Sequence, residues 1–542
     1  MAETNLAETV IEYLSSRQVR HVFGVLAHTS FALGDAIAKR PHIRFIHAQH
    51  EGGAGNMALG YARATKKPAV CLVSAGGGAT NIVTAVAQAH KESVPLFVIS
   101  SDIGTASSAK GARSSWHGMD HVGLFQPITK QSLKLERVEE IGSVLDSLFR
   151  QTTRGRQGPV FLCIPADLQS ASLPEPLNFS ETADLIAPAI DSRSAEMAVD
   201  LLLSATAPVV LVGTGVDWSG AKEEVQELAE LLGAPVATSY TAKGVFPENN
   251  LLALGCLGGG GRPYARKFFL ESDLILALGT TFSEGTTLGF RHRTIPEKAK
   301  IIQIDIDPEE LGRNYPTHLS MQADVKAALR TITAGIKSQK PSAGRGVRRL
   351  QEIQEAKQAW KSELENKTAN GRLTYDSVLK VLNELLTGKE TLVTAGMTGD
   401  LLRNIDAVVP IIHAGEFRAI GTAFAASLGV KLGLPDSRVI CVTGDGSFMM
   451  EQQELATARL HNIPVLVIVL RNNAYGGMKR DQLKNYDGRV IGTDLFVPDL
   501  TRLAELFGAK GFSLSRTDEV KPVFQRALES DDFVVVDVKL DV

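Results

Sequence analysis

Two apolar stretches of the chain end in polar residues whose types could bind a metal ion or a phosphate. The stretch VICVTGDGSF carries Asp445 between Gly444 and Gly446, and the stretch IPVLVIVLRNN carries Asn472. Short, continuous Val/Ile/Leu runs are typical of parallel strands that are buried on both faces. Apolar packing gives such strands no reason to end in an aspartate or in asparagines. The two polar endings therefore need another explanation.

The segment between the two stretches predicts how they are placed. Residues 447–462 predict a single crossover helix, with Met449 and Leu455 on its apolar face and Glu451 and Glu454 on its polar face. Two parallel strands joined by such a helix lie side by side or nearly so. Both polar loops then lie at the carboxyl edge of one sheet, which is where open α/β sheets bind ligands.

The chemistry of these loops favours a hard cation. A carboxylate, an amide oxygen and backbone carbonyls form an all-oxygen ligand set, which suits Mg²⁺ or Ca²⁺ and not zinc. Phosphates usually complete the coordination of Mg²⁺, and Gly444 and Gly446 allow backbone N–H groups to approach an anion. Ser447 begins the predicted helix, whose N-terminus also favours an anion. We infer a magnesium diphosphate or triphosphate site; the alternative is that each loop is an ordinary turn.

Composition is that of a globular enzyme with several domains. The chain has 542 residues, 44% of them hydrophobic and 22% charged, and its formal net charge of −3 gives no general reason to bind nucleic acid. Cys71, Cys163, Cys256 and Cys441 are scattered and indicate buried free thiols. The N-terminal residues do not resemble a signal peptide, and no run of apolar residues is long enough to span a membrane. We expect a cytoplasmic protein without a membrane partner.

The pattern of apolar runs and helical stretches recurs three times. We predict an α/β protein of three doubly wound parallel-sheet domains, at residues 1–182, 190–337 and 373–542. Residues 338–372 are polar and charged, and predict a linker with a solvated helix.

The GDG…NN pattern resembles the thiamine-diphosphate-binding motif of the acetohydroxy acid synthase, pyruvate decarboxylase and benzoylformate decarboxylase superfamily, and the resemblance covers essentially the whole chain. It implies a pyrimidine-binding domain, a central nucleotide-like domain and a diphosphate-binding domain, in that order. It also implies that Asp445 and Asn472 bind Mg²⁺ through their side chains and Ala474 through its carbonyl. Arg471 departs from the family pattern, so Asn473 is the alternative ligand; the spacing from Asp445 favours Asn472.

The cofactor needs a second element, a carboxyl group that protonates its aminopyrimidine ring. That protonation lets the aminopyrimidine remove a proton from the thiazolium carbon, and the carboxyl group should lie in a mostly apolar pocket that adjusts its pKa. The segment HAQHEGGAGNMALGYAR resembles the family segment that carries this group, and Glu51 matches its activating glutamate. The alternative is a simple N-terminal helix charge. In relatives the two cofactor-binding domains come from different subunits, which implies a homodimer or homotetramer with active sites at the subunit interface.

The segment HAGEFRAIGTAF precedes the GDG strand and resembles the family segment beneath the cofactor. Ile420 fits the apolar wedge that props the cofactor. Arg418 stands where relatives usually have glycine; its carbonyl could accept a hydrogen bond from the aminopyrimidine. Its side chain either faces a substrate carboxylate or phosphate or turns away into a salt bridge. The resemblance implies further cofactor contacts at Gly396, Met397, Gly444, Gly446, Ser447 and Met478.

Residues that act on substrate are less well marked. His28 follows the first strand, in a loop that faces the thiazolium in relatives, and His117 lies near a position where synthases often carry glutamine. Either could move protons at neutral pH, and the alternative for both is a structural histidine. Met478 lies where simple decarboxylases often carry a carboxylate, and the absence of that carboxylate favours a carboligase or a lyase.

The leading hypothesis is a carboligase that resembles acetohydroxy acid synthase, decarboxylating a 2-oxo acid and adding the resulting carbanion to a second carbonyl. The alternatives are a non-oxidative 2-oxo acid decarboxylase, a lyase acting on 2-hydroxyacyl thioesters or ketones, a flavin-dependent oxidase and a catalytically silent binding protein. The glycine-rich loop GTGVDWSG of the central domain leaves FAD, ADP and coenzyme A open, and the full set of flavin contacts is not identified.

Overall fold

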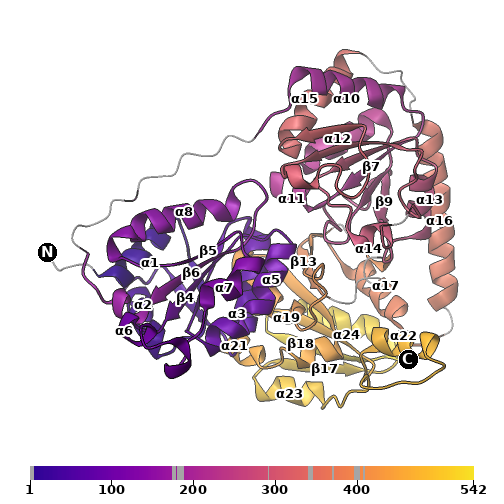
Figure 1. Ribbon diagram of the computed structural model, residues 1–542. Helices are drawn as coiled ribbons and strands as arrows, with labels where there is room; N and C mark the ends of the chain where they lie inside the picture. Colours follow the sequence, from indigo (N-terminus) through magenta and orange to yellow (C-terminus); the bar gives the residue numbers. More distant parts are fainter. Residues whose placement is uncertain are drawn as a thin grey trace.

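The computed structural model consists of three α/β domains arranged along the chain (Figure 1). The structure describes residues 5–173, 179, 188–290, 292–339, 346–368, 371–395, 403–406 and 409–541.

The N-terminal domain is a six-stranded parallel sheet in the order β2-β1-β3-β4-β6-β5. Its strands are β1 (His21–Gly24), β2 (Arg44–His47), β3 (Ala69–Val73), β4 (Leu96–Asp102), β5 (Gln131–Lys134) and β6 (Val160–Pro165). Its helices are α1 (Leu6–Ser16), α2 (Phe31–Ala38), α3 (Glu51–Thr65), α4 (Gly77–Asn81), α5 (Val83–Lys91), α6 (Thr105–Ser108), α7 (His121–Phe125), α8 (Ile141–Thr153) and α9 (Ala166–Gln169), with short 3₁₀ turns between them.

The middle domain is a second parallel sheet in the order β12-β11-β10-β7-β8-β9. Its strands are β7 (Pro208–Val212), β8 (Val236–Thr238), β9 (Ala253–Cys256), β10 (Leu274–Leu278), β11 (Lys300–Asp305) and β12 (Leu319–Gln322). Its helices are α10 (Ser192–Ser204), α11 (Thr214–Ser219), α12 (Lys222–Leu232), α13 (Pro263–Leu270), α14 (Glu284–Thr287) and α15 (Val325–Ser338). Helix α16 (Val347–Thr368) lies in the predicted linker; it runs down the outer side of this domain and is largely exposed (Figure 1).

The C-terminal domain is a third parallel sheet in the order β14-β13-β15-β16-β18-β17. Its strands are β13 (Glu390–Thr394), β14 (Ile411–His413), β15 (Arg438–Gly444), β16 (Leu466–Arg471), β17 (Lys510–Leu514) and β18 (Val534–Lys539). Its helices are α17 (Tyr375–Leu385), α19 (Ala423–Gly433), α20 (Asp445–Met449), α21 (Glu454–His461), α22 (Gly476–Asn485), α23 (Leu500–Leu506) and α24 (Thr517–Glu529).

The predicted fold class is confirmed by these three parallel sheets with interleaved helices. The central strands are continuous Val/Ile/Leu runs because helices cover both faces of each sheet, as the full burial of β3, β7 and β10 shows. No helix in the described part of the chain combines the length and the apolar character needed to cross a membrane.

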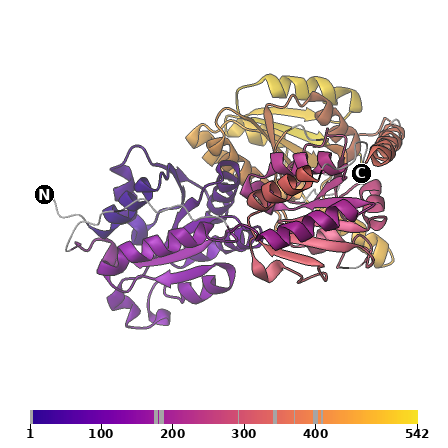
Figure 2. The same cartoon turned by 90° about the horizontal axis from the view of Figure 1, so that it is seen from above.

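The N-terminal and C-terminal domains meet where helix α3 crosses helix α19 (Figure 1). Seen from above, the N-terminal domain extends to one side of the other two domains (Figure 2). The crossing is close because each helix presents a glycine to the backbone of the other. A Cβ atom on Gly60 would lie 2.1 Å from the carbonyl oxygen of Ala426, and one on Gly429 would lie 1.8 Å from that of Met57. Larger residues would push the helices apart, so these glycines set the distance between the two domains.

Candidate active site at the edges of two sheets

Asp445 and Asn472 are neighbours, as the sequence predicts, because strands β15 and β16 pair directly. Asp445 is almost fully buried, and its Oδ2 accepts backbone hydrogen bonds from Asn472 (3.0 Å) and Asn473 (2.5 Å). Burial raises the pKa of Asp445 above its ordinary value, although these hydrogen bonds and Arg471 oppose the shift. No side-chain cation of the described residues forms an ion pair with Asp445, which leaves its carboxylate available to a metal ion.

The two adjacent asparagines in the loop after β16 differ in their surroundings. Asn473 is exposed, adopts a left-handed backbone (φ 54°), and its Oδ1 accepts a hydrogen bond from Arg471 Nε at 2.8 Å. Asn472 is half-buried, and within the described part of the chain its Oδ1 accepts only the nearby N–H of Ala474, at 3.0 Å. The all-oxygen set of Asp445, Asn472 and the Ala474 carbonyl is of the kind that Mg²⁺ binds.

The loop before α19 is tied to the loop after β15. The Gly421 N–H donates to Ser447 Oγ at 2.8 Å, and Ser447 lies in the first turn of α20, next to Gly446. Arg418 has a left-handed backbone with φ 61°, a conformation that costs about 1–2 kcal/mol for a residue with a Cβ and nothing for glycine. This explains why a glycine would suit position 418. Ile420 lies in the same loop, three residues before α19, and its side chain is 42% exposed.

Glu51 begins helix α3 at the carboxyl edge of the first sheet and is 8% exposed. Its Oε2 accepts a hydrogen bond from Asn81 Nδ2 at 2.9 Å, and a Cβ atom on Gly78 would lie 3.0 Å from its Oε1. The turn after β3, which contains Gly76, Gly78 and Asn81, therefore shapes the pocket of this carboxyl group. One turn further along α3, Asn56 Nδ2 donates to the Gly421 carbonyl at 3.1 Å.

Both candidate histidines lie next to the same turn after β3. His117 is exposed with φ 62°, and its Cα would lie 2.9 Å from a Cβ on Gly76. His28 is exposed and its ring lies tilted against that of Phe31, with the ring centroids 5.1 Å apart, while its neighbour Thr29 accepts the Ala75 N–H at 3.3 Å. The structure thus places Glu51 and the two histidines around one loop.

Other sequence-predicted cofactor contacts fall at the edges of this region. Met478 lies in α22 and is 59% exposed. Gly444 caps the N-terminus of α20. Gly396 and Met397 lie outside the described residues.

The prediction of one crossover helix with Glu451 and Glu454 on a polar face is wrong. The crossover consists of α20 and α21, joined by a turn, and both carboxylates are buried. Glu451 Oε2 accepts the N–H groups of Phe424 (3.0 Å) and Ala425 (3.4 Å) at the start of α19, and its Oε1 accepts Asn56 Nδ2 at 3.1 Å. The turn exists because these unpaired helix N–H groups draw the carboxylate inward.

Glu454 makes similar contacts with the loop immediately before Glu51. Its two oxygens accept the backbone N–H groups of Gln49 (3.2 Å) and His50 (3.1 Å), and Thr457 donates to it at 2.6 Å. Both glutamates were missed as site-positioning residues. The sequence does contain a signal for this role, because two carboxylates three residues apart, Glu451 and Glu454, closely follow the loop at Asp445.

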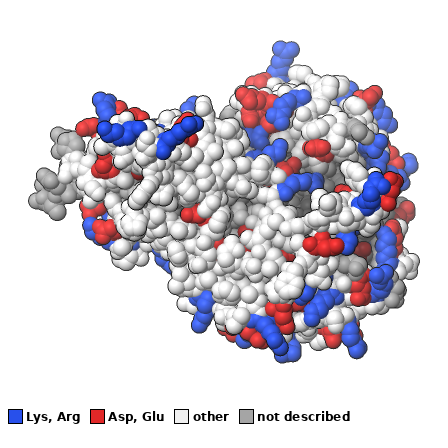
Figure 3. Space-filling view, turned by 60° about the horizontal axis from the view of Figure 1, so that its bottom comes forward, with Lys and Arg blue, Asp and Glu red and all other residues white. Residues whose placement is uncertain are grey.

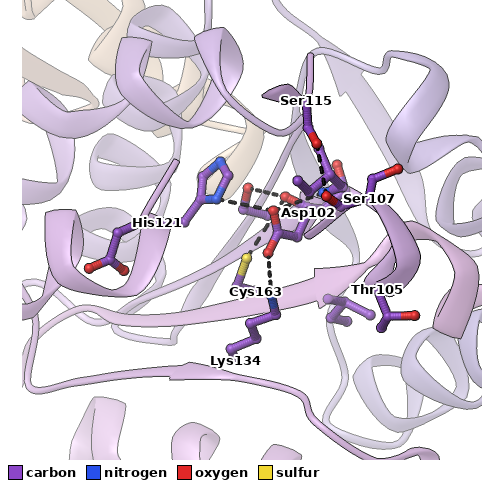
Figure 4. Close-up of polar contacts among 12 residues, drawn as sticks. Asp102, Thr105, Ser107, Ser115, His121, Lys134 and Cys163 are labelled. Carbon is purple, nitrogen blue, oxygen red and sulfur yellow. Dashed lines mark hydrogen bonds and ion pairs between the residues drawn. The ribbon is translucent and has the colours of Figure 1, made fainter. Parts of the chain in front are cut away.

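Asp102, His121 and Cys163 form a second buried group of potential metal ligands in the N-terminal domain (Figure 4). The Gly76 N–H donates to His121 Nε2 at 2.8 Å, so the ring proton lies on Nδ1, which is 3.3 Å from Asp102 Oδ1. Lys134 Nζ lies 2.8 Å from the other Asp102 oxygen. Burial raises the pKa of Asp102, but the bonds from His121 and Lys134 prevail and lower it to about 2.

Such a group does not suit a metal ion, because the Nδ1 proton and the ammonium of Lys134 already occupy the positions of ligand electron pairs. Its contact with Gly76 instead supports the turn that surrounds Glu51.

Two adjoining cavities lie between the domains. The first, of about 550 Å³, covers the carboxyl edge of the middle sheet and is lined there by Gly213, Ser239, Gly279 and Asp305, with Arg154 and Arg156 from the N-terminal domain. The second, of about 580 Å³, lies between the middle domain and the loop at Arg418. Burial raises the pKa of Asp305 to about 6.

Three parallel-sheet domains with polar loops gathered at the sheet edges are the architecture of a cofactor-dependent α/β enzyme. Family models match all three domains: the N-terminal TPP binding domain of thiamine pyrophosphate enzymes at residues 4–124, their central domain at 195–332 and their C-terminal TPP binding domain at 403–538.

Relatives match over nearly the whole chain. A probable acetolactate synthase large subunit of Methanococcus aeolicus is 31% identical over 99% of this chain and 92% of its own length. The acetolactate synthase large subunit of Haemophilus influenzae is 32% identical (100% and 95%), and the isozyme 3 large subunit of Escherichia coli is 31% identical (99% and 94%). The chain therefore belongs to the thiamine pyrophosphate enzymes, which confirms the predicted family and the dependence on thiamine diphosphate.

The buried carboxylate of Glu451 generates a prediction about pH. Burial raises its pKa in the folded chain to about 8, from an ordinary value of 4.5. The folded state then holds the proton more tightly than the unfolded state, so this stabilising contribution is full below pH 4.5 and is lost as the pH rises through about 8. Glu451→Gln stays neutral, and its thermal unfolding midpoint should decline less over this range than that of the wild type.

Glu529→Gln is the matched control, because Glu529 is exposed at the end of α24. Its unfolding midpoint should follow the wild type at every pH. Parallel curves for the wild type and Glu451→Gln would show that Glu451 does not titrate in this window.

Proposed function

We propose that the chain is an acetolactate-synthase-like carboligase, which decarboxylates a 2-oxo acid and joins the remaining fragment to the carbonyl of a second substrate. Full-length similarity to acetolactate synthase large subunits supports this reaction. The structural observation that supports it is that two buried carboxylates, Glu51 and Asp445, each lie at the carboxyl edge of a sheet, in two domains whose helices α3 and α19 cross.

Thiamine diphosphate and Mg²⁺ are the cofactors of this proposal. Asp445, Asn472 and the Ala474 carbonyl would bind Mg²⁺; Asn472 is the better ligand because Arg471 already occupies the side-chain oxygen of Asn473. Gly444, Gly446 and Ser447 would contact the diphosphate through the start of α20.

Thiamine diphosphate bound here would supply a nucleophilic carbon and, in its thiazolium ring, an acceptor for the electron pair left by decarboxylation. Glu51 would hold a proton on its carboxyl group toward the aminopyrimidine, in the pocket formed by Gly78 and Asn81. Ile420 and the Arg418 carbonyl would orient the cofactor from the other domain. His28 and His117 would exchange protons with substrate at the turn after β3.

A non-oxidative decarboxylase or a 2-hydroxyacyl lyase is the second candidate. The two adjoining cavities favour it, because together they would accept a donor larger than a short 2-oxo acid. The same cavities leave FAD, ADP and coenzyme A open as ligands of the middle domain. Met478, at a position where a carboxylate would assist quick protonation, favours a carboligase or a lyase over a simple decarboxylase.

The reaction is tested by proton NMR of the purified chain with thiamine diphosphate and Mg²⁺. Pyruvate and larger 2-oxo acids are supplied singly, with and without an acceptor aldehyde. We expect acetolactate or a mixed hydroxy ketone as product. Free aldehyde as the sole product would show that the chain is a decarboxylase. No conversion of any 2-oxo acid would contradict both the carboligase and the decarboxylase, and would favour a lyase with a specialised donor.

Two substitutions should separate chemistry from cofactor binding. Glu51→Gln removes the proton donor but keeps the shape of the side chain, so turnover should fall at least about 100-fold while thiamine diphosphate stays bound. Asp445→Ala removes a metal ligand, so calorimetry should show weaker binding of both thiamine diphosphate and Mg²⁺. Turnover that survives in Glu51→Gln, or unchanged binding by Asp445→Ala, would refute the corresponding role.

The chain is further proposed to form a homodimer or homotetramer with active sites at the subunit interface. Figure 3 shows a broad area with few charged side chains, extending from the N-terminal domain toward the centre of the molecule. Ile420 and Met478 of the candidate site are exposed in the single chain, as is Met450, whose side chain lies beside Gly421. A second copy would cover such a surface.

Complementation between two inactive variants tests whether sites are shared. If each site takes Glu51 from one chain and Asp445 from its partner, a mixed dimer of Glu51→Gln and Asp445→Ala chains has one intact site. Random co-assembly should then restore about a quarter of wild-type activity. If every site lies within one chain, each site carries one substitution and the mixture stays inactive, which would contradict sharing.

A further inference from the structure

The second cavity contains polar groups to which the proposed chemistry assigns no role. It lies between the middle domain and the loop that connects β14 to α19, and its lining includes Tyr240, Arg313, His413, Gly415, Glu416 and Arg418. The loop is linked to the candidate cofactor site through Gly421 and Ser447. A substrate that reacts at that site could therefore extend into this cavity.

Arg418 contributes an unpaired cation to the cavity. Among the described residues, no carboxylate forms an ion pair with its guanidinium group and no side-chain hydrogen bond involves it. Other arginines near the site are held in place: Arg63 by Glu92 at 3.2 Å and Arg471 by Asp537 at 3.1 Å. An arginine that keeps a left-handed backbone and has no partner points to a role in binding.

His413 provides a second, independent observation. It is 1% exposed, and neither ring nitrogen has a hydrogen-bond partner among the described residues. Burial, with a smaller effect of Arg63 and Arg418, lowers the pKa of its imidazole to about 3, so the ring is neutral and offers one donor and one acceptor. Buried polar groups are rarely left unpaired, so this ring needs a partner from within the cavity.

Recognition in this cavity depends on geometry rather than on net charge. Glu284, Glu416 and Lys91 also line it, and Arg313 forms an ion pair with Glu310 at 3.1 Å. A guanidinium group presents a planar fork of donors that matches a carboxylate, a phosphonate or a sulfonate. Of the two arginines that line the cavity, Arg418 is the one whose guanidinium N–H groups are available to such an anion.

We propose that Arg418 and His413 form a subsite for a second anionic group of the substrate, remote from its reacting carbonyl. The substrate class is then a 2-oxo acid that carries a carboxylate, phosphonate or sulfonate at its far end. This inference rests on the proposed function, and it assigns to the Arg418 side chain a task separate from that of its backbone carbonyl.

Substrate pairs of equal length test the proposal on the holoenzyme. 2-Oxoglutarate and 2-oxopentanoate differ in the far carboxylate, and the wild type should prefer the former at least about tenfold in kcat/KM. Arg418→Gly should bring the ratio close to one. Both substrates are compared on the same variant, so any loss of activity that disturbance of the loop causes for both substrates cancels in the ratio. Glycine also adopts the left-handed backbone of position 418 without strain. Phosphonate and sulfonate analogues of the same length identify the preferred anion.

Two further variants make the assignment specific. Arg418→Lys keeps the charge without the fork and should retain part of the preference. Arg313→Gln should leave the ratio unchanged; an equal fall in this variant would assign recognition to overall charge and overturn the role of Arg418. A wild-type ratio near one, or a ratio that Arg418→Gly does not change, would overturn the proposal as well.

Calorimetry with unreactive probes separates this proposal from the proposed function. Glutarate should bind the wild-type holoenzyme at least about tenfold more tightly than pentanoate, and Arg418→Gly should bind the two alike. If no 2-oxo acid is converted, the proposed reaction is refuted, but glutarate binding still tests whether the anion subsite exists. Equal binding of both probes by the wild type overturns the subsite even if the reaction is confirmed.

Discussion

The buried carboxylate of Glu451 joins the parts of the molecule on which the candidate site depends. It accepts two N–H groups at the start of α19 and the side-chain amide of Asn56 on α3. One group therefore satisfies a helix terminus of the C-terminal domain and holds a helix of the N-terminal domain against it. Without this contact, the close glycine-mediated crossing of α3 and α19 would leave polar groups unpaired in an apolar interface.

From that crossing, both ends of the candidate site are positioned. Helix α3 begins at Glu51 and helix α19 follows Ile420, so a change in the crossing would move these two side chains relative to each other. Glu454 adds a second connection, since it holds the backbone immediately before Glu51. The two domains of one chain are thereby held in a fixed relative position, so that each presents its part of a candidate site from a firmly packed helix.

Sequence patterns predicted the parts of the fold that are buried on both sides. The central strands of all three sheets are apolar runs of the predicted kind, whereas β5, β9, β12, β14 and β17 contain no long Val/Ile/Leu run. All five lie at sheet edges, where strands are short and one side is not covered by a neighbouring strand. Likewise, Glu451 and Glu454 were assigned to a polar face, because a sequence period cannot show that unpaired N–H groups from another segment will draw a carboxylate inward.

The resemblance to the family leads us to expect other residues at positions 418 and 471. The structure shows that the two arginines found there differ in their surroundings. Arg471 is accommodated by its surroundings: its guanidinium group donates to Asn473, to Asp537 and to the carbonyls of Val497 and Pro498, and so leaves Asn472 beside Asp445. Arg418 has no such set of partners among the residues that the structure describes, and it keeps an unfavourable backbone conformation. A substitution that its surroundings satisfy has a structural explanation, whereas one that remains strained and unpaired beside a cavity calls for a ligand.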